Sequence, residues 1–162
     1  MAERRVLVEL YRHNAWANLA LLAACAGLTD AQLDVSTAGT YGRLRDTLVH
    51  ICAAEERYVT RLTSERPEKP LREADGFPGF DDLRSRSRAS GDALVAIATG
   101  ADADWMVTAR VGGEERQIGA SVVLTQAINH ATEHRQQAMT AMAQQGLAVP
   151  DLSGWAYAET VR

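Results

Sequence analysis

The sequence has little of several features that mark particular classes of protein. Its 162 residues include only two cysteines and a single lysine, Lys69, and no run of like charge is longer than two residues. Two cysteines are too few for a disulfide framework in a chain of this length, so we expect a cytoplasmic protein. Acidic residues outnumber basic ones by 21 to 17 and no basic patch is present, which argues against nucleic acid as a partner.

Long apolar runs are missing as well. The longest uncharged stretch, residues 13–29, contains a histidine and two asparagines. A membrane-spanning helix needs about 20 predominantly apolar residues, so we expect no membrane partner. The hydrophobic share of 46% and the charged share of 23% suit a single globular domain over residues 1–162.

Four long segments carry apolar residues at steps of three and four, the pattern of amphipathic helices. Short strand-like runs on either side of Gly112 and Gly113 predict a small hairpin before the last of them. Residues 64–79 hold three of the four prolines and are expected to form a long connection. The sequence therefore predicts an all-α fold, most simply a four-helix bundle. The expected helices are 3–28, 43–63, 81–98 and 120–145.

Three of the four histidines lie on two of these expected helices. His130 and His134 are four residues apart, so both imidazoles project from one face of the last helix. That face also carries Val123, Ala127 and Ala138 and should point into the bundle. A metal ion there needs a third ligand from another helix, for which His50 is the candidate and His13 a spare. The alternative is that these histidines are simply hydrogen-bonded.

The segment from His130 to His134 also fits H-x-x-E-H, the inverted zinc peptidase motif in which a glutamate, here Glu133, activates water. That mechanism needs a further carboxylate ligand downstream. Glu159 is the only glutamate after His134, which disfavours the peptidase interpretation.

Three other polar or sulfur-bearing residues are expected inside the bundle. Glu55 interrupts the apolar stripe of the second helix, which predicts an interior salt bridge with an arginine. Cys25 and Cys52 are expected to be core residues, as free cysteines usually are.

Three blocks of sequence together resemble the DinB/YfiT-like metalloenzyme superfamily: residues 11–18 (YRHNAWAN), 47–55 (TLVHICAAE) and 129–136 (NHATEHRQ). The resemblance covers nearly the whole chain. It implies an up-down-down-up four-helix bundle, commonly dimeric, with a divalent metal ion, often nickel or zinc, held by three histidines. The matching positions are His50, His130 and His134. Many members carry an aromatic residue where this chain has Glu133.

The resemblance also implies a function. Characterised relatives include thiol-dependent S-transferases or isomerases, which use a low-molecular-weight thiol against small electrophiles, and this is the preferred interpretation. A metal-dependent hydrolase is the alternative within the family, and a non-catalytic metal-binding or small-ligand-binding stress-response protein is a third. Glu133, beside the ligands, is expected either to accept a proton or to orient an imidazole.

A homodimer is expected on two grounds. Family members commonly pair through helix faces, and the first helix carries apolar residues away from its main stripe of Leu7, Leu10, Ala17 and Leu21. These extra residues are Val6, Val8, Leu19 and Leu22.

Overall fold

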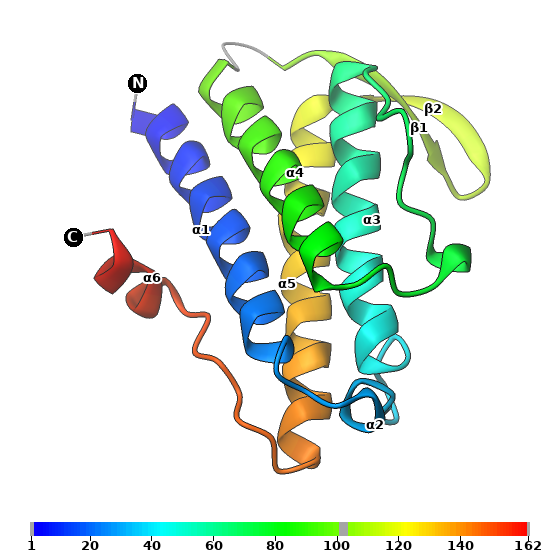
Figure 1. Ribbon diagram of the computed structural model, residues 1–162. Coiled ribbons are helices and arrows are strands. Elements are labelled where there is room, and N and C mark those ends of the chain that lie inside the picture. The colour runs from blue at the N-terminus through cyan, green and yellow to red at the C-terminus, as the bar shows by residue number, and fades with distance from the viewer. Residues whose placement is uncertain (1, 101–103, 162) are drawn as a thin grey trace.

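The computed structural model describes residues 2–100 and 104–161. Four long helices lie side by side, and the colour gradient in Figure 1 shows two of them descending and the other two rising. The predicted all-helical fold with a small hairpin is confirmed. The long helices are α1 (Ala2–Cys25), α3 (Leu44–Thr63), α4 (Phe80–Gly100) and α5 (Ala120–Gln144); the shorter elements are α2 (Asp30–Leu33), the 3-10 helix η1 (Glu73–Asp75), β1 (Met106–Val111), β2 (Glu114–Gly119) and α6 (Gly154–Thr160). No helix among the described residues is long and apolar enough to cross a membrane.

Element boundaries differ from the prediction where capping decides them. The first helix stops at Cys25 rather than at residue 28, just before Gly27. Thr29 then caps α2, because its side chain accepts from the backbone N–H of Gln32 and the Gln32 side chain accepts from the N–H of Thr29. Downstream, the tail expected after α5 contains the helix α6.

The hairpin forms where the glycine pair predicted it. Val111 pairs with Glu114, so Gly112 and Gly113 are the two turn residues, and both have positive φ (62° and 88°). A two-residue turn of this kind needs φ above zero at both positions, which glycine adopts without strain. Val107 and Ala109 on β1 are buried and fix the hairpin against the bundle.

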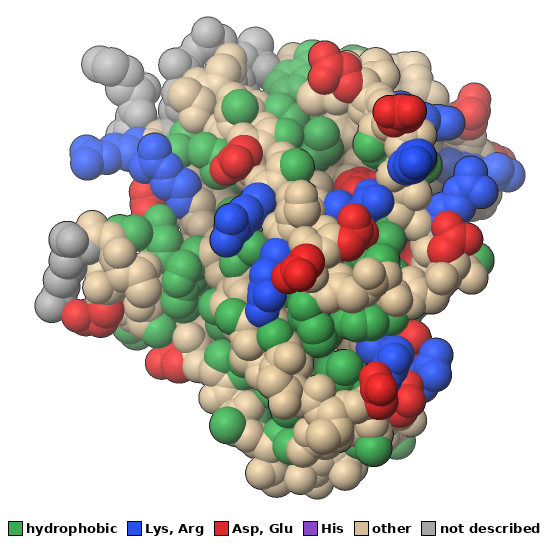
Figure 2. Space-filling view, viewed as in Figure 1, with side chains coloured by type: hydrophobic (Ala, Val, Ile, Leu, Met, Phe, Trp, Pro, Cys, Tyr) green, Lys and Arg blue, Asp and Glu red, His purple; other side chains and the backbone are tan. Residues whose placement is uncertain are grey.

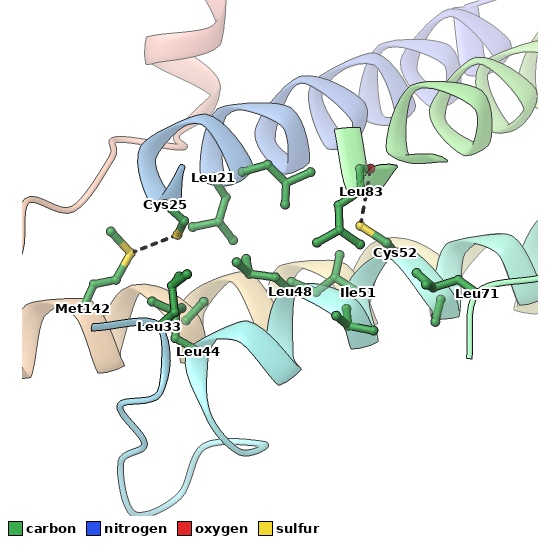
Figure 3. Packing of buried hydrophobic residues seen from close by; sticks show 14 residues of the cluster. Leu21, Cys25, Leu33, Leu44, Leu48, Ile51, Cys52, Leu71, Leu83 and Met142 are labelled. Carbon is green, nitrogen blue, oxygen red and sulfur yellow. Dashed lines mark hydrogen bonds between the residues drawn. The ribbon is translucent and has the colours of Figure 1, made fainter. Parts of the chain in front are cut away.

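Two apolar clusters fill the interior. The first joins the end of α1, the first half of α3, the start of α4 and the end of α5, and in Figure 3 Cys25 lies beside Met142 and Cys52 beside Leu83. Both cysteines are buried, as predicted. The second cluster lies at the other end of the bundle, around Tyr11, Leu94 and Val123 under the hairpin.

The buried face of α1 is turned relative to the predicted stripe. Leu10, expected inside, is 46% exposed, whereas Leu22, expected outside, is 2% exposed. Tyr11 replaces Leu10 in the core, because its ring is buried and its hydroxyl donates to the carbonyl of Leu124 at 2.7 Å. The aromatic ring buries more apolar surface than leucine and brings its own hydrogen bond.

Gly91 lies inside α4 without interrupting it, and the reason is a close helix contact. A Cβ placed on Gly91 would lie 2.7 Å from the Cβ of Ala15 on α1. We therefore expect Gly91→Ala to force α1 and α4 apart and to destabilise the protein by about 1–3 kcal/mol in urea unfolding, although alanine favours helix.

Gly100, at the end of the same helix, provides the matched control because nothing lies within 4 Å of its Cβ position. Gly100→Ala should be neutral or slightly stabilising. Equal effects of the two substitutions would show that the close α1–α4 contact is not limiting.

Candidate metal centre

The structure brings the three predicted histidines together. His50 extends from α3, and His130 and His134 extend from adjacent turns of α5. One ligand nitrogen from each lies within 4.8 Å of the others, and the Nε2 atoms of His50 and His130 are 3.0 Å apart. Two imidazole nitrogens bound to one ion at about 2.0–2.1 Å are separated by a similar distance. The donor set and its spacing therefore fit a single transition-metal ion.

Two side chains orient these rings from behind. The Nδ1 of His50 lies 3.0 Å from a carboxylate oxygen of Glu73, and the Nδ1 of His134 lies 3.0 Å from the amide oxygen of Gln137. An acceptor on Nδ1 fixes the tautomer with the proton on that atom, so Nε2 keeps its lone pair. Gln137 is itself held, because its oxygen also accepts from the backbone N–H of Tyr41.

Aromatic rings form walls of the cluster. Tyr41 stacks on His50 with ring centroids 3.8 Å apart and meets His134 edge-on at 5.3 Å. Tyr58 meets His130 edge-on at 5.7 Å. These contacts restrict ring rotation and reduce the access of water from their side.

Burial and the neighbouring imidazoles favour the neutral form of His50 and His130. Burial is the main cause of a lowered pKa at His50 and of a pKa of about 4 at His130, where the neighbouring imidazoles add to the effect. Glu73 is ionised: burial alone would raise its pKa, but hydrogen bonds from Tyr41 and His50 hold that pKa at about 2. Neutral imidazoles backed by a carboxylate are the form that binds a metal ion near pH 7.

A polar layer crosses the bundle between the two apolar clusters. Glu55 is 1% exposed and accepts from the side-chain amide of Asn14 at 2.7 Å. Arg135, one residue after His134, donates to Asn14 at 2.6 Å and to Asn18 at 2.7 Å. The predicted interior role of Glu55 is thus confirmed, but its arginine is reached through an asparagine rather than by a direct salt bridge. Both asparagines of the 11–18 block, Asn14 and Asn18, therefore belong to this layer.

The remaining sequence candidates lie outside the cluster. His13 contacts the carbonyl of Leu152 at 2.9 Å and packs with Trp16 and Tyr157. Glu133 is exposed, and its carboxylate lies 3.4 Å from the side-chain nitrogen of Gln137. Sequence reasoning missed Glu73 and Gln137. Only the spacing of Gln137, three residues after His134 on the same helix, offered a signal.

The fold and the histidine cluster define a helical-bundle protein with a candidate three-histidine metal centre. A comparison with family models places the chain more narrowly, because residues 1–161 match the model described as the DinB family. The chain therefore belongs to the DinB family.

A solved structure agrees with this assignment. It is the crystal structure of a DinB-like protein from Bacillus cereus ATCC 10987, with a TM-score of 0.67. The match covers 89% of this chain and 93% of that chain at 22% sequence identity, so it supports the fold. A comparison with curated proteins gave no significant match.

Glu55 should make stability depend on pH. Burial raises the pKa of this carboxyl from 4.5 to about 7, against the opposing effects of Asn14 and Arg135. Between these values the folded state binds more protons than the unfolded state, so stability falls as pH rises from about 4.5 to 7. In urea unfolding, the free energy of unfolding of Glu55→Gln should fall less between pH 4.5 and 7 than that of the unchanged protein. The difference should be about 2 kcal/mol.

A chelator in every sample removes any contribution from bound metal. Glu68→Gln, at an exposed position in the 64–79 connection, is the control and should reproduce the unchanged pH profile. Parallel profiles for Glu55→Gln and the unchanged protein would show that Glu55 does not titrate in this range.

Proposed function

We propose that the protein is a metal-dependent enzyme in which His50, His130 and His134 hold one divalent ion, zinc or nickel. The donor set carries this proposal: three imidazoles converge, and no fourth histidine, cysteine or carboxylate of the described residues joins their group. Structural zinc sites are closed by four protein ligands, whereas catalytic sites keep a position for water or substrate. The missing carboxylate ligand also speaks against the inverted peptidase interpretation.

The reaction that we propose is S-transfer, or an isomerisation, that uses a low-molecular-weight thiol. A bound divalent ion would supply a Lewis acid that lowers the pKa of a thiol or water. The chain's own thiols are unsuitable nucleophiles, since burial raises the pKa of Cys25 to about 12 and that of Cys52 as well. The sulfur must therefore come from a small molecule, and family membership favours this chemistry.

Each remaining part of the site has a role in this proposal. Glu73 holds the Nδ1 proton of His50, and Gln137 holds that of His134. Glu133 acts as a positioning residue, because its carboxylate fixes the amide of Gln137. In the transfer step the thiol sulfur bonds to the electrophilic carbon, the leaving group departs with its electron pair, and the thiol proton passes to solvent.

Metal content tests the site directly. Untagged protein should carry about one divalent ion per chain by elemental analysis. His50→Ala, His130→Ala and His134→Ala should each lower occupancy at least tenfold, because two imidazoles bind an ion weakly. His13→Ala should leave occupancy unchanged, since His13 packs with Trp16 and Tyr157. Full occupancy in the His50 variant would eliminate a site shared between α3 and α5.

Turnover tests the reaction. We expect the metal-loaded protein to accelerate the reaction of 1-chloro-2,4-dinitrobenzene with at least one of cysteine, glutathione and a glucosaminyl-cysteine thiol, with chloride released. The His134→Ala variant should return the rate to that of the thiol alone. Hydrolysis of aryl esters without thiol consumption would support a hydrolase instead. A metal-loaded protein that does neither would support a binding protein.

We also propose that the chain forms a homodimer through α1 and α5. Within each chain we propose the up-down-down-up helix order, which agrees with the helix directions in Figure 1. Val6 and Val122 are 61% and 57% exposed, and a groove between these helices is lined by Leu7, Leu10, Leu124 and Ile128 together with Ser121, Thr125 and Asn129. A second copy would cover this apolar surface.

Light scattering at micromolar concentration should give about twice the 17.6 kDa chain mass. Leu10→Glu should halve that mass, because it places a charge in the groove between α1 and α5. Val149→Glu is the matched control, since Val149 is 43% exposed against 46% for Leu10 and lies after α5. A monomer at all concentrations contradicts the dimer.

A further inference from the structure

A cavity adjoins the histidine cluster without containing a histidine. It has a volume of about 680 Å³ and is lined by residues of α3, of the connection that follows it and by Thr108 of β1. Figure 1 shows the connection running beside α3 and past the hairpin. Glu73 and Arg57 line the cavity, and Glu73 also contacts His50. One side chain therefore separates the cavity from the candidate metal centre.

The acidic side chains of this cavity are already occupied. Glu56 accepts from Arg86 at 2.7 Å with one oxygen and from the backbone N–H of Leu71 at 2.8 Å with the other. Glu73 uses one oxygen for His50 and the other for Arg57, each at 3.0 Å. Neither carboxylate is free to neutralise a further cation.

Three arginines of the cavity remain without such partners. Arg61, Arg66 and Arg72 line it and form no salt bridge or side-chain hydrogen bond with any described residue. In Figure 2 blue and red side chains alternate over the upper right of the molecule, where α3, the connection and the hairpin meet. In a chain with a net charge of −4, three unpaired arginines around one cavity are a local positive field.

Apart from Thr60 and Thr108, the rest of the lining is apolar, and two prolines stiffen it. Pro67 and Pro70 fix the backbone of the connection, and Leu71 is buried at its base. Ala53 and Ala74 complete an apolar surface suited to a carbon skeleton. Guanidinium groups bind carboxylate and phosphate through paired N–H donors, so the cavity combines anion recognition with an apolar wall.

We infer that this cavity binds a small organic anion with two or more carboxylate or phosphate groups. The binding itself is independent of the function proposed above, but its role as the substrate site rests on that function. An anion held by Arg61, Arg66 and Arg72 would lie across Glu73 from His50, with its uncharged end free to extend toward the histidines.

Calorimetric titration of chelator-treated full-length protein tests the binding. The probes are tricarballylate, pyrophosphate and the uncharged triamide of tricarballylate. Tricarballylate or pyrophosphate should bind and the triamide should not, and the tighter of the two anions identifies the preferred group. Binding of neither anion, or equal binding of the triamide, overturns the inference.

Substitutions locate the site. Arg61→Gln, Arg66→Gln and Arg72→Gln should each weaken anion binding at least about fivefold, and the Arg66→Gln, Arg72→Gln double variant should abolish it. Arg88→Gln is the matched control, because Arg88 is exposed on α4 and does not line this cavity. Equal affinities in all variants would place the anion elsewhere and overturn the inference, whatever their stability.

The same samples separate this inference from the proposed function. Anion binding that depends on the arginines in a protein that takes up no metal would overturn the enzyme and leave the anion site standing. If the protein takes up metal and consumes thiol but its anion affinity does not depend on the arginines, the proposed enzyme stands and the anion site is overturned. If both hold, KM for a dicarboxylate electrophile should rise in the arginine variants, while kcat changes less and metal occupancy stays at the unchanged level.

Discussion

The buried Glu55 carboxyl and Arg135 guanidinium constrain everything else in this bundle. Both lie inside the protein, where an unpartnered charge costs several kcal/mol, and two asparagines of α1 connect them. Because these four side chains come from α1, α3 and α5, their hydrogen bonds set how the three helices align along their axes. An apolar interior tolerates a shift of one turn more readily than a polar layer of this kind does.

The positions of the three histidines depend on that alignment of the helices. His134 immediately precedes Arg135 on α5, and His50 lies on α3 five residues before Glu55, so the contacts of the polar layer restrict where the imidazoles can be. Along each long helix, buried polar residues lie between the two apolar clusters; on α4 these are Ser87 and Ser90. The interior is thus divided into apolar, polar and apolar zones, and the candidate centre lies beside the polar one.

The sequence was sufficient for the helices and for the His130 and His134 pair, because both depend on local spacing, whereas the choice of His50 came from the resemblance to the family. Steps of three and four identify a helix, and a separation of four residues places His130 and His134 on one face. It was insufficient wherever two distant segments compete for the same space. The Tyr11 and Leu10 positions are equally compatible with the pattern of α1, and Tyr11 is favoured inside by contacts with distant residues, its packing in the second cluster and its hydrogen bond to the carbonyl of Leu124.

The positions of Glu73 and the cavity arginines were even less predictable from the sequence. They lie in or next to residues 64–79, where prolines and glycines indicate a connection but give no information about its path. The path nevertheless places one carboxylate against His50 and Arg57 at once. The three histidines are fixed by helices, whereas the side chains that we propose to contact substrate come from the connection and the helix end before it. Changes at the arginines of that segment can therefore alter which anion is bound without moving a histidine of the candidate centre, because neither the polar layer that aligns α3 with α5 nor the Glu73–His50 contact includes these arginines.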